Sequence, residues 1–250
     1  MSPFAAVVRT TVQQLAGRSR VVGFGLLSLV PAGLLYAASR VREVVGLDTD
    51  LGALVVTPFF AVVLPLTTLI LASSALGDER REKTLSFVVL RPIGPLQIVV
   101  AKTLATFAVS MGYALLGAIA LGTTYMVLGG RIDVVPAIVA GAALVCALYS
   151  SVFVLLGSIF ARATLVGLAY VLFVENVLVG ELPRLASGSP WRVGLAATID
   201  LMPETFPSRA ILGAIGDLEP SAPLALLATA TTATIAVAVC TLLLVKTDSV

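Results

Sequence analysis

Long stretches without a charged residue decide what this 250-residue chain can fold into. Five of them contain no Asp, Glu, Lys or Arg: 21–39, 51–77, 103–130, 134–161 and 220–245. Because a helix needs roughly 20 apolar residues to cross about 30 Å of hydrocarbon, each stretch predicts a membrane span. A sixth, 163–174, reaches that length if Glu175 is tolerated and the helix continues to about Gly180.

Composition points the same way, since 58% of the residues are hydrophobic and 12% are charged. Soluble domains carry about 25% charged residues. The runs are continuous rather than alternating, which favours helices over a β-barrel. We therefore expect an all-α membrane protein, a single domain over 1–250 with six transmembrane helices in the lipid bilayer. A net charge of +2 gives no reason to expect a nucleic-acid partner.

The basic residues predict the orientation. One side of the predicted layout holds ten of them: Arg9, Arg18, Arg20, the loop residues Arg80, Arg81, Lys83, Arg91 and Lys102, and then Arg162 and Lys246. The other side holds six: Arg40, Arg42, Arg131, Arg184, Arg192 and Arg209. Since Lys and Arg accumulate in cytoplasmic loops, both termini are expected in the cytoplasm, with the protein in the plasma (cell inner) membrane.

The first twenty residues predict a helix lying on the inner membrane surface. Its apolar side chains recur at helical spacing: Phe4, Val7, Val8, Val12 and Leu15. We prefer this to an early start of the first span, because Gly-Arg-Ser-Arg at 17–20 suits a helix interior in lipid poorly. The first span itself is predicted to be retained, and to be loosened by Pro31.

Residues 181–220 predict a long outer segment between the fifth and sixth spans. Two parts of it, 191–202 and 205–220, have the pattern of short amphipathic helices, the second capped by Thr205. One face of that second helix would carry four apolar side chains: Ile211, Ala214, Ile215 and Leu218. Such helices would dip into the outer leaflet, roof a cavity or contact an accessory protein.

Six consecutive charged residues, Asp78 to Lys83, separate the second and third apolar stretches. Asp78 is a favoured N-cap, so a cytoplasmic helix is predicted from there to Leu90, ending before Pro92. Leu85, Val88 and Val89 would form an apolar stripe on this helix, flanked by charged residues. Such a stripe suggests docking on a partner protein or, alternatively, on the membrane surface.

This region resembles the permeases of type-2 ABC exporters. Their motif runs E-x-E-x-G-T-L, then L-x-x-P-I/V-S-R, then I and a G/A-K pair. The corresponding residues here are Glu82-Lys83-Thr84-Leu85, Leu90-Arg91-Pro92-Ile93, Ile98 and Ala101-Lys102. The family's Gly before Thr is missing, and Gly94-Pro95 replaces its Ser-Arg, so no role of that Arg is transferred.

The resemblance implies that residues 78–95 form a coupling helix seated in a cytoplasmic ATP-binding subunit. The residues expected to carry this contact are Asp78, Glu79, Arg80, Arg81, Glu82, Lys83, Thr84, Leu85, Arg91 and Pro92. It also implies two ATPase subunits per complex, with ATP and Mg²⁺ bound there rather than by this chain. A second permease copy or a related permease would complete the exporter. Its substrate would be hydrophobic or amphipathic.

The residues themselves restrict the chemistry of this chain. A Walker A loop needs Gly-Lys followed by Ser or Thr, and none of the three lysines follows a glycine. The chain has no histidine, and its cysteines, Cys146 and Cys240, both fall within predicted spans. Histidine-dependent metal sites and Ser-His-Asp hydrolysis are therefore excluded, and we predict no catalytic residue and no metal.

Glu175 is the one acidic residue within a predicted span, with Asn176 beside it. Ionisable groups in spans are candidates for function, so both residues are candidates for the translocation path. Alternatively, Glu175 reaches the outer interface or pairs with Arg184.

Two further functions stay open at this stage. The chain is alternatively the membrane part of an ABC-type assembly or maturation system. The second alternative is an ATP-independent membrane protein, either a carrier or a carboxylate-based intramembrane enzyme that uses Glu175.

Overall fold

The computed structural model describes residues 2–45, 56–81, 94–129, 134–160, 162–178, 188–202 and 209–247. Helices account for nearly all of these residues, and no strand occurs among them. Five helices are long and apolar enough to cross a membrane: Arg18–Val41, Val56–Leu76, Pro95–Val127, Val134–Ile159 and Ala222–Val245. The predicted all-helical membrane fold is confirmed for this part of the chain.

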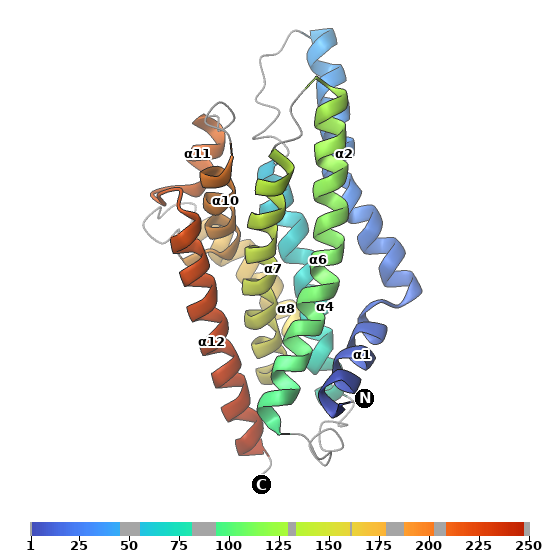
Figure 1. Cartoon of the computed structure of the whole chain (residues 1–250), viewed down its shortest axis with the longest axis vertical. Helices are drawn as coiled ribbons and strands as arrows, with labels where there is room; N and C mark the ends of the chain where they lie inside the picture. The colour runs from blue at the N-terminus through green and yellow to red at the C-terminus, as the bar shows by residue number, and fades with distance from the viewer. Residues whose placement is uncertain are drawn as a thin grey trace.

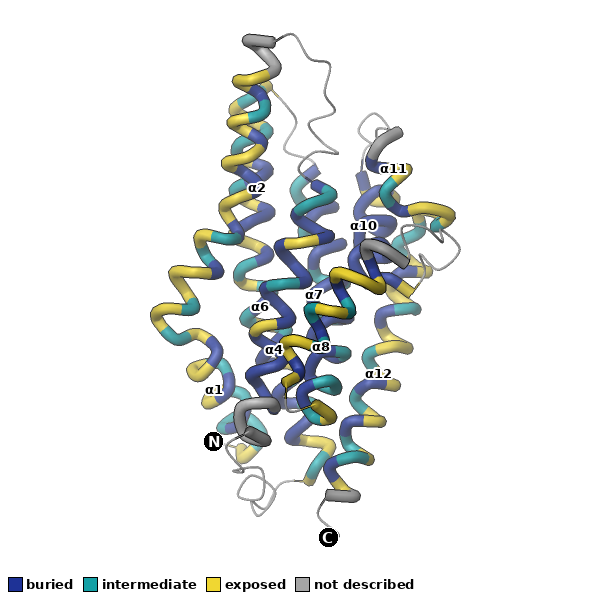
Figure 2. The backbone as a smooth tube through the Cα atoms, turned by 180° about the vertical axis from the view of Figure 1, so that it is seen from behind, coloured by how far each residue is buried: buried dark blue, intermediate teal, exposed yellow. Residues whose placement is uncertain are grey.

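The long helices run side by side, and both termini lie at the same end of the bundle (Figure 1). They are α2 (Arg18–Val45), α4 (Leu64–Arg81), α6 (Pro95–Val127), α7 (Val134–Ile159) and α12 (Ala222–Thr247). In the candidate span Val56–Leu76, 83% of the residues are buried, whereas in Ala222–Val245 only 22% are buried. Helices α4 and α7 therefore form the core, while α2 and α12 expose much of their apolar surface at the edges (Figure 2).

The predicted amphipathic helix at the N-terminus is present as α1 (Pro3–Leu15). Ser2 caps it, with its hydroxyl accepting from the Ala5 amide at 3.3 Å. Val7, Thr11 and Leu15 are buried at intervals of four residues, as one stripe of a helix requires. This stripe packs mainly against α6, and α2 starts only three residues after α1 ends.

The prolines of the first two spans have different local effects. Pro31 lies inside α2, which remains one continuous helix around it. In the second span, a π-helix η1 (Phe59–Val63) follows Pro58 and passes into α4. A π-helix shifts the register of the backbone hydrogen bonds, and both phenylalanine rings of this one, Phe59 and Phe60, are fully buried.

The structure corrects the predicted start of the charged helix. Asp78 does not cap a new helix, because α4 continues without a break from Leu64 through Asp78 to Arg81. The next helix, α6, begins at Pro95 after Gly94, because proline suits the first turn of a helix. At its other end α6 is followed by Gly129, whose φ of 85° favours glycine.

The predicted fifth span is described only as far as residue 178. Its described residues form α8 (Ala163–Ala169) and a second π-helix, η2 (Tyr170–Leu178). These residues are too few for a span at the usual α-helical rise of 1.5 Å, because crossing the hydrocarbon takes roughly 20 residues. Helix α8 packs against α4 and α7, and Gly167 lets it approach the side chain of Leu69 closely.

Two short helices follow towards the opposite end of the bundle. Helix α10 (Pro190–Leu201) was predicted to be amphipathic, and this is wrong: every residue from Pro190 to Ile199 is buried. It packs against α7, α11 and α12, so this stretch presents little surface to lipid or water. Helix α11 (Arg209–Ile215) does bury Ile211 and Ile215 on one face, as predicted, whereas Thr205 lies outside the described residues.

Candidate coupling end and buried polar cluster

Helix α4 ends, and α6 begins, at the end of the bundle that also holds α1 and both termini (Figure 1). Asp78, Glu79, Arg80 and Arg81 form the last turn of α4. The remaining predicted coupling residues lie outside the described residues: Glu82, Lys83, Thr84, Leu85, Arg91 and Pro92. The structure therefore describes both helices that carry the segment 78–95, but not its middle.

Lys102 is not the loop residue that we predicted. It lies two turns inside α6 and only 2% of it is exposed. Its ammonium Nζ donates to the carbonyl oxygen of Ala75 in α4 at 2.5 Å. A buried ammonium group is costly unless it is hydrogen-bonded, so this contact ties the start of α6 firmly to the end of α4.

Two neighbours of Ala75 make similar contacts with other helices. The hydroxyl of Ser74 accepts from Nη1 of Arg20 in α2 at 3.1 Å. The hydroxyl of Ser73 lies 2.8 Å from that of Thr164 in α8. Three consecutive residues of α4 therefore bond to three different helices, one turn before the charged end.

We call this group the α4 anchor: Ser73, Ser74 and Ala75 with Arg20, Lys102 and Thr164. Sequence reasoning missed it, although Lys102 belongs to the motif quoted above and the Ser-Ser pair interrupts an apolar run. The partners lie 27 to 91 residues apart in the chain, so no local pattern reveals the pairing.

Glu175 forms a second polar group, deep in the protein. The residue is fully buried, so the alternative that it reaches the outer interface is wrong. Its Oε2 accepts from the hydroxyl of Tyr149 in α7 and, at 3.5 Å, from that of Ser189 just before α10. Tyr170 and Arg192 are its further polar neighbours. These five residues are called the Glu175 cluster below.

The cluster depends on close contact between α7 and α10. A Cβ on Gly141 of α7 would overlap the Thr198 hydroxyl, and one on Gly194 of α10 would lie 2.9 Å from the Gly141 carbonyl oxygen. Glycine at both positions lets the two backbones meet, as small residues do in membrane helix pairs. The contact holds the start of α10, with Trp191 and Arg192, against Tyr149 of α7.

The side chains around the cluster are fixed by packing. The guanidinium of Arg192 lies 4.9 Å from the centre of the Trp191 ring, a cation–π contact. The rings of Tyr149 and Phe153 stack at 5.0 Å. Within the described residues, the Glu175 Oε1 atom and the Trp191 Nε1 atom are buried without a hydrogen-bond partner. The Glu175 Oε1 acceptor and the Trp191 Nε1 donor are therefore open to a small polar group.

This arrangement suits binding or holding a proton better than covalent catalysis. No described group of three His, Cys, Asp or Glu residues could hold a metal ion. Asn176 follows in η2, but its side chain is outside the part described, as is Arg184. Sequence reasoning found Glu175 and missed Tyr149, Ser189 and Arg192. Tyr-Ser-Ser at 149–151 was the available signal, since it interrupts an otherwise apolar helix.

A bundle of long apolar helices with a charged connection at one end defines a multi-pass membrane protein. The sequence pattern of the ABC-2 family transporter proteins matches residues 18–180, about two thirds of the chain. The chain therefore belongs to the ABC-2 transporter family, and the resemblance of residues 78–102 is confirmed at that level. No protein with curated function matches it significantly.

Membership makes the chain the membrane component of an ABC transporter, a permease rather than an enzyme. Permeases of this family work with a cytoplasmic ATP-binding subunit. The match begins with α2 and ends just after η2, so it includes the α4 anchor and Glu175 and stops before α10.

Proposed function

We propose that this permease exports a hydrophobic or amphipathic substrate, driven by ATP and Mg²⁺ bound to a separate subunit. Two ATP-binding subunits and a second permease, identical or related, complete the transporter. The protein lies in the plasma membrane, and both termini and residues 78–95 face the cytoplasm. Segment α8–η2, together with the residues that follow it, makes the fifth of six crossings.

The observation that carries the proposal is the α4 anchor. A force applied to residues 78–95 reaches the bundle through the last turn of α4 and the first turns of α6. Because Ser73, Ser74 and Ala75 are bonded to α8, α2 and α6, the end of α4 cannot move without those helices. Closure of the ATP-binding subunits would therefore reorient several membrane helices together, which is what alternating access requires.

The composition of the walls supports the substrate class. The exposed surfaces of α2 and α12 are apolar over most of their length, and within the described residues the buried interior is apolar apart from hydroxyls, Lys102 and the Glu175 cluster. Such surfaces suit molecules that partition into lipid rather than strongly hydrated ions.

The first test is gentle purification of the tagged chain from native membranes, with mass spectrometry of the bound proteins. We expect a stoichiometric Walker-type ATPase, and a chain that purifies without one would contradict the proposal. Reversing the charges at Glu79 and Glu82 should abolish substrate-coupled ATP hydrolysis while the protein still folds. Full transport by that E79K/E82K variant would exclude residues 78–95 as the coupling element.

The Glu175 cluster favours one second candidate, an ATP-independent carrier that moves protons or cations. A buried carboxylate with an unpartnered oxygen, inside a membrane protein, is typical of ion and proton pathways. This function requires transport to survive E79K/E82K and to be abolished by Glu175→Gln. The exporter function requires transport to be abolished by E79K/E82K and to survive Glu175→Gln.

A further inference from the structure

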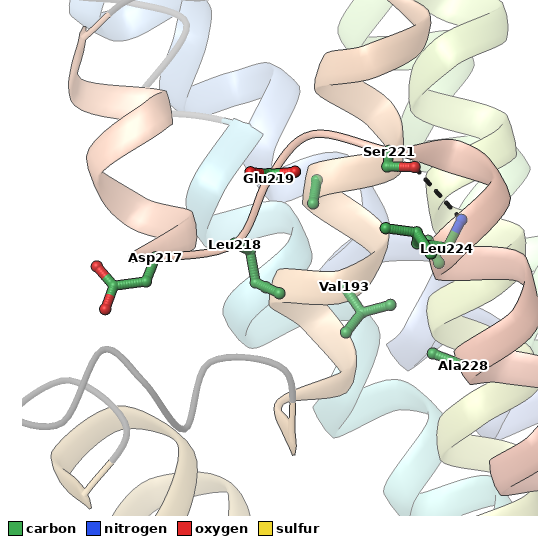
Figure 3. A pocket seen from close by; sticks show the side chains of 9 residues that line it. Val193, Asp217, Leu218, Glu219, Ser221, Leu224 and Ala228 are labelled. Carbon is green, nitrogen blue, oxygen red and sulfur yellow. Dashed lines mark hydrogen bonds between the residues drawn. The ribbon is translucent and has the colours of Figure 1, made fainter.

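A pocket lies between α10, the α11–α12 connection and the first turns of α12 (Figure 3). Its volume is about 320 Å³, within the range of small-ligand sites. It is open to the outside, unlike the Glu175 cluster, and shares no residue with it.

The floor of the pocket is apolar. Helix α10 contributes Val193 and Ala196, and α12 contributes Leu224, Ala225 and Ala228. Leu218 points towards Val193 from the connection (Figure 3). An aliphatic chain suits such a floor, because it has no polar group that would need a hydrogen-bond partner there.

The rim of the pocket is acidic. Asp217 and Glu219 are exposed carboxylates of the α11–α12 connection, and no basic side chain lines this pocket in the described part of the chain. Neither carboxylate has a hydrogen bond or ion pair within that part. Capping of α12 uses other groups instead: Asp200 accepts from the Ala222 amide at 2.9 Å, and Ser221 accepts from the Leu224 amide at 3.4 Å.

The pocket therefore joins two environments. The candidate span of α12 starts at Ala222, so Asp217 and Glu219 lie just beyond it, where a membrane helix leaves the hydrocarbon. Leu224 and Leu227, on the first turns of the span, are 60% and 61% exposed and belong to its lipid-facing surface. A ligand at this place has its tail level with the acyl chains and its head level with water.

We propose that the pocket binds an amphiphilic cation, with one alkyl chain on the floor and an ammonium head at the acidic rim. Charge complementarity selects the head, because the carboxylates repel phosphate and sulfate heads and attract ammonium. As a statement about exported cargo, this rests on the proposed function. On that basis, the pocket narrows the proposed substrates to cationic amphiphiles. They would leave at the end of the bundle opposite residues 78–95.

The test measures binding of radiolabelled decyltrimethylammonium to the full chain in phosphatidylcholine nanodiscs, relative to empty nanodiscs. Decyl sulfate and decyl maltoside serve as the anionic and neutral counterparts with the same tail. We expect saturable binding of the ammonium probe that is at least tenfold tighter than binding of the sulfate. Equal binding of the two probes, or no saturable binding above empty nanodiscs, would overturn the proposal.

Two variants separate head from tail. Asp217→Asn with Glu219→Gln should weaken ammonium binding roughly tenfold and leave maltoside binding unchanged, because two exposed charges are lost and no packing changes. Ala228→Leu should weaken binding of both probes by filling the floor. Unchanged ammonium binding by the charge-neutral variant would reduce the site to a groove for lipid tails.

The outcomes are independent of the exporter proposal, since binding is measured without ATP and without a partner. If the probe does not bind but an ATPase co-purifies, the pocket proposal fails and the exporter proposal stands. Failure to retain an ATPase, conversely, leaves a measured ammonium site intact.

Discussion

Substituting Gly141 by alanine should separate α7 from α10 and destabilise the protein. The new Cβ would lie against the Thr198 hydroxyl and 2.5 Å from the Gly194 carbonyl oxygen, whereas real Cβ contacts essentially never fall below 3.0 Å. A side chain can rotate away, but a backbone carbonyl cannot. Helix α10 must therefore move by about half an ångström or more relative to α7.

The expected magnitude follows from two opposing effects. Overpacking of this kind costs about 1–3 kcal/mol, while replacing glycine by alanine inside a helix returns up to about 1 kcal/mol. The net loss should be about 1–2 kcal/mol of unfolding free energy. For a chain of this size, each kcal/mol corresponds to roughly 2–4 °C in Tm.

The assay is thermal unfolding in detergent, followed by the fluorescence of Trp191. This is the only tryptophan of the chain and it is buried in α10, so its emission reports on the helix that must move. Gly112→Ala is the matched control, because a Cβ at that exposed position of α6 meets nothing within 4 Å. Adding Thr198→Ala to Gly141→Ala should restore part of the loss. An unfolding midpoint of Gly141→Ala equal to that of the control would refute the reasoning.

Three further outcomes are expected. Tyr149→Phe should lower the unfolding free energy by about 1–3 kcal/mol, because a buried Glu175 oxygen loses a donor; a midpoint equal to that of Tyr36→Phe, an exposed-site control, would contradict this. Lys102→Met should keep the ATP-binding subunit bound but reduce transport per ATP hydrolysed at least severalfold, since the link from α6 to Ala75 is removed; unchanged coupling would show that the link carries no load. Cys146 and Cys240 are buried, so a maleimide should label them only after unfolding, and rapid labelling of the native protein would argue against this packing.

The sequence predicted the long helices well because lipid imposes a simple requirement on them. A segment in hydrocarbon must satisfy its own backbone hydrogen bonds and carry few charges, so an uncharged run of sufficient length is nearly sufficient to identify it. The fifth segment deviates because η2 is a π-helix, whose altered register has no simple sequence signal. Helix α10 deviates because its polar residues, Arg192 and Thr198, face protein rather than water.

A candidate site residue could be predicted only where its side-chain chemistry stands out from the residues next to it in the sequence. Glu175 was found because a carboxylate in an apolar run is rare, but its partners come from α7 and from the start of α10. Lys102 was misplaced because the positive charge was taken as a sign of a loop. A single ammonium with a carbonyl partner is compatible with a buried helix position, and only the packing of α4 against α6 reveals that partner.

The length of α6 links the lipid environment to the coupling end. Its 33 residues extend about 50 Å, well beyond about 30 Å of hydrocarbon. A helix with such an excess adapts to a thinner bilayer by tilting. Because Lys102 fixes the start of α6 to α4, a tilt of α6 also displaces the two helix ends that carry residues 78–95. Bilayer thickness should therefore set how well those ends match an ATP-binding partner, so that the same complex has different coupling efficiency in membranes of different lipid composition.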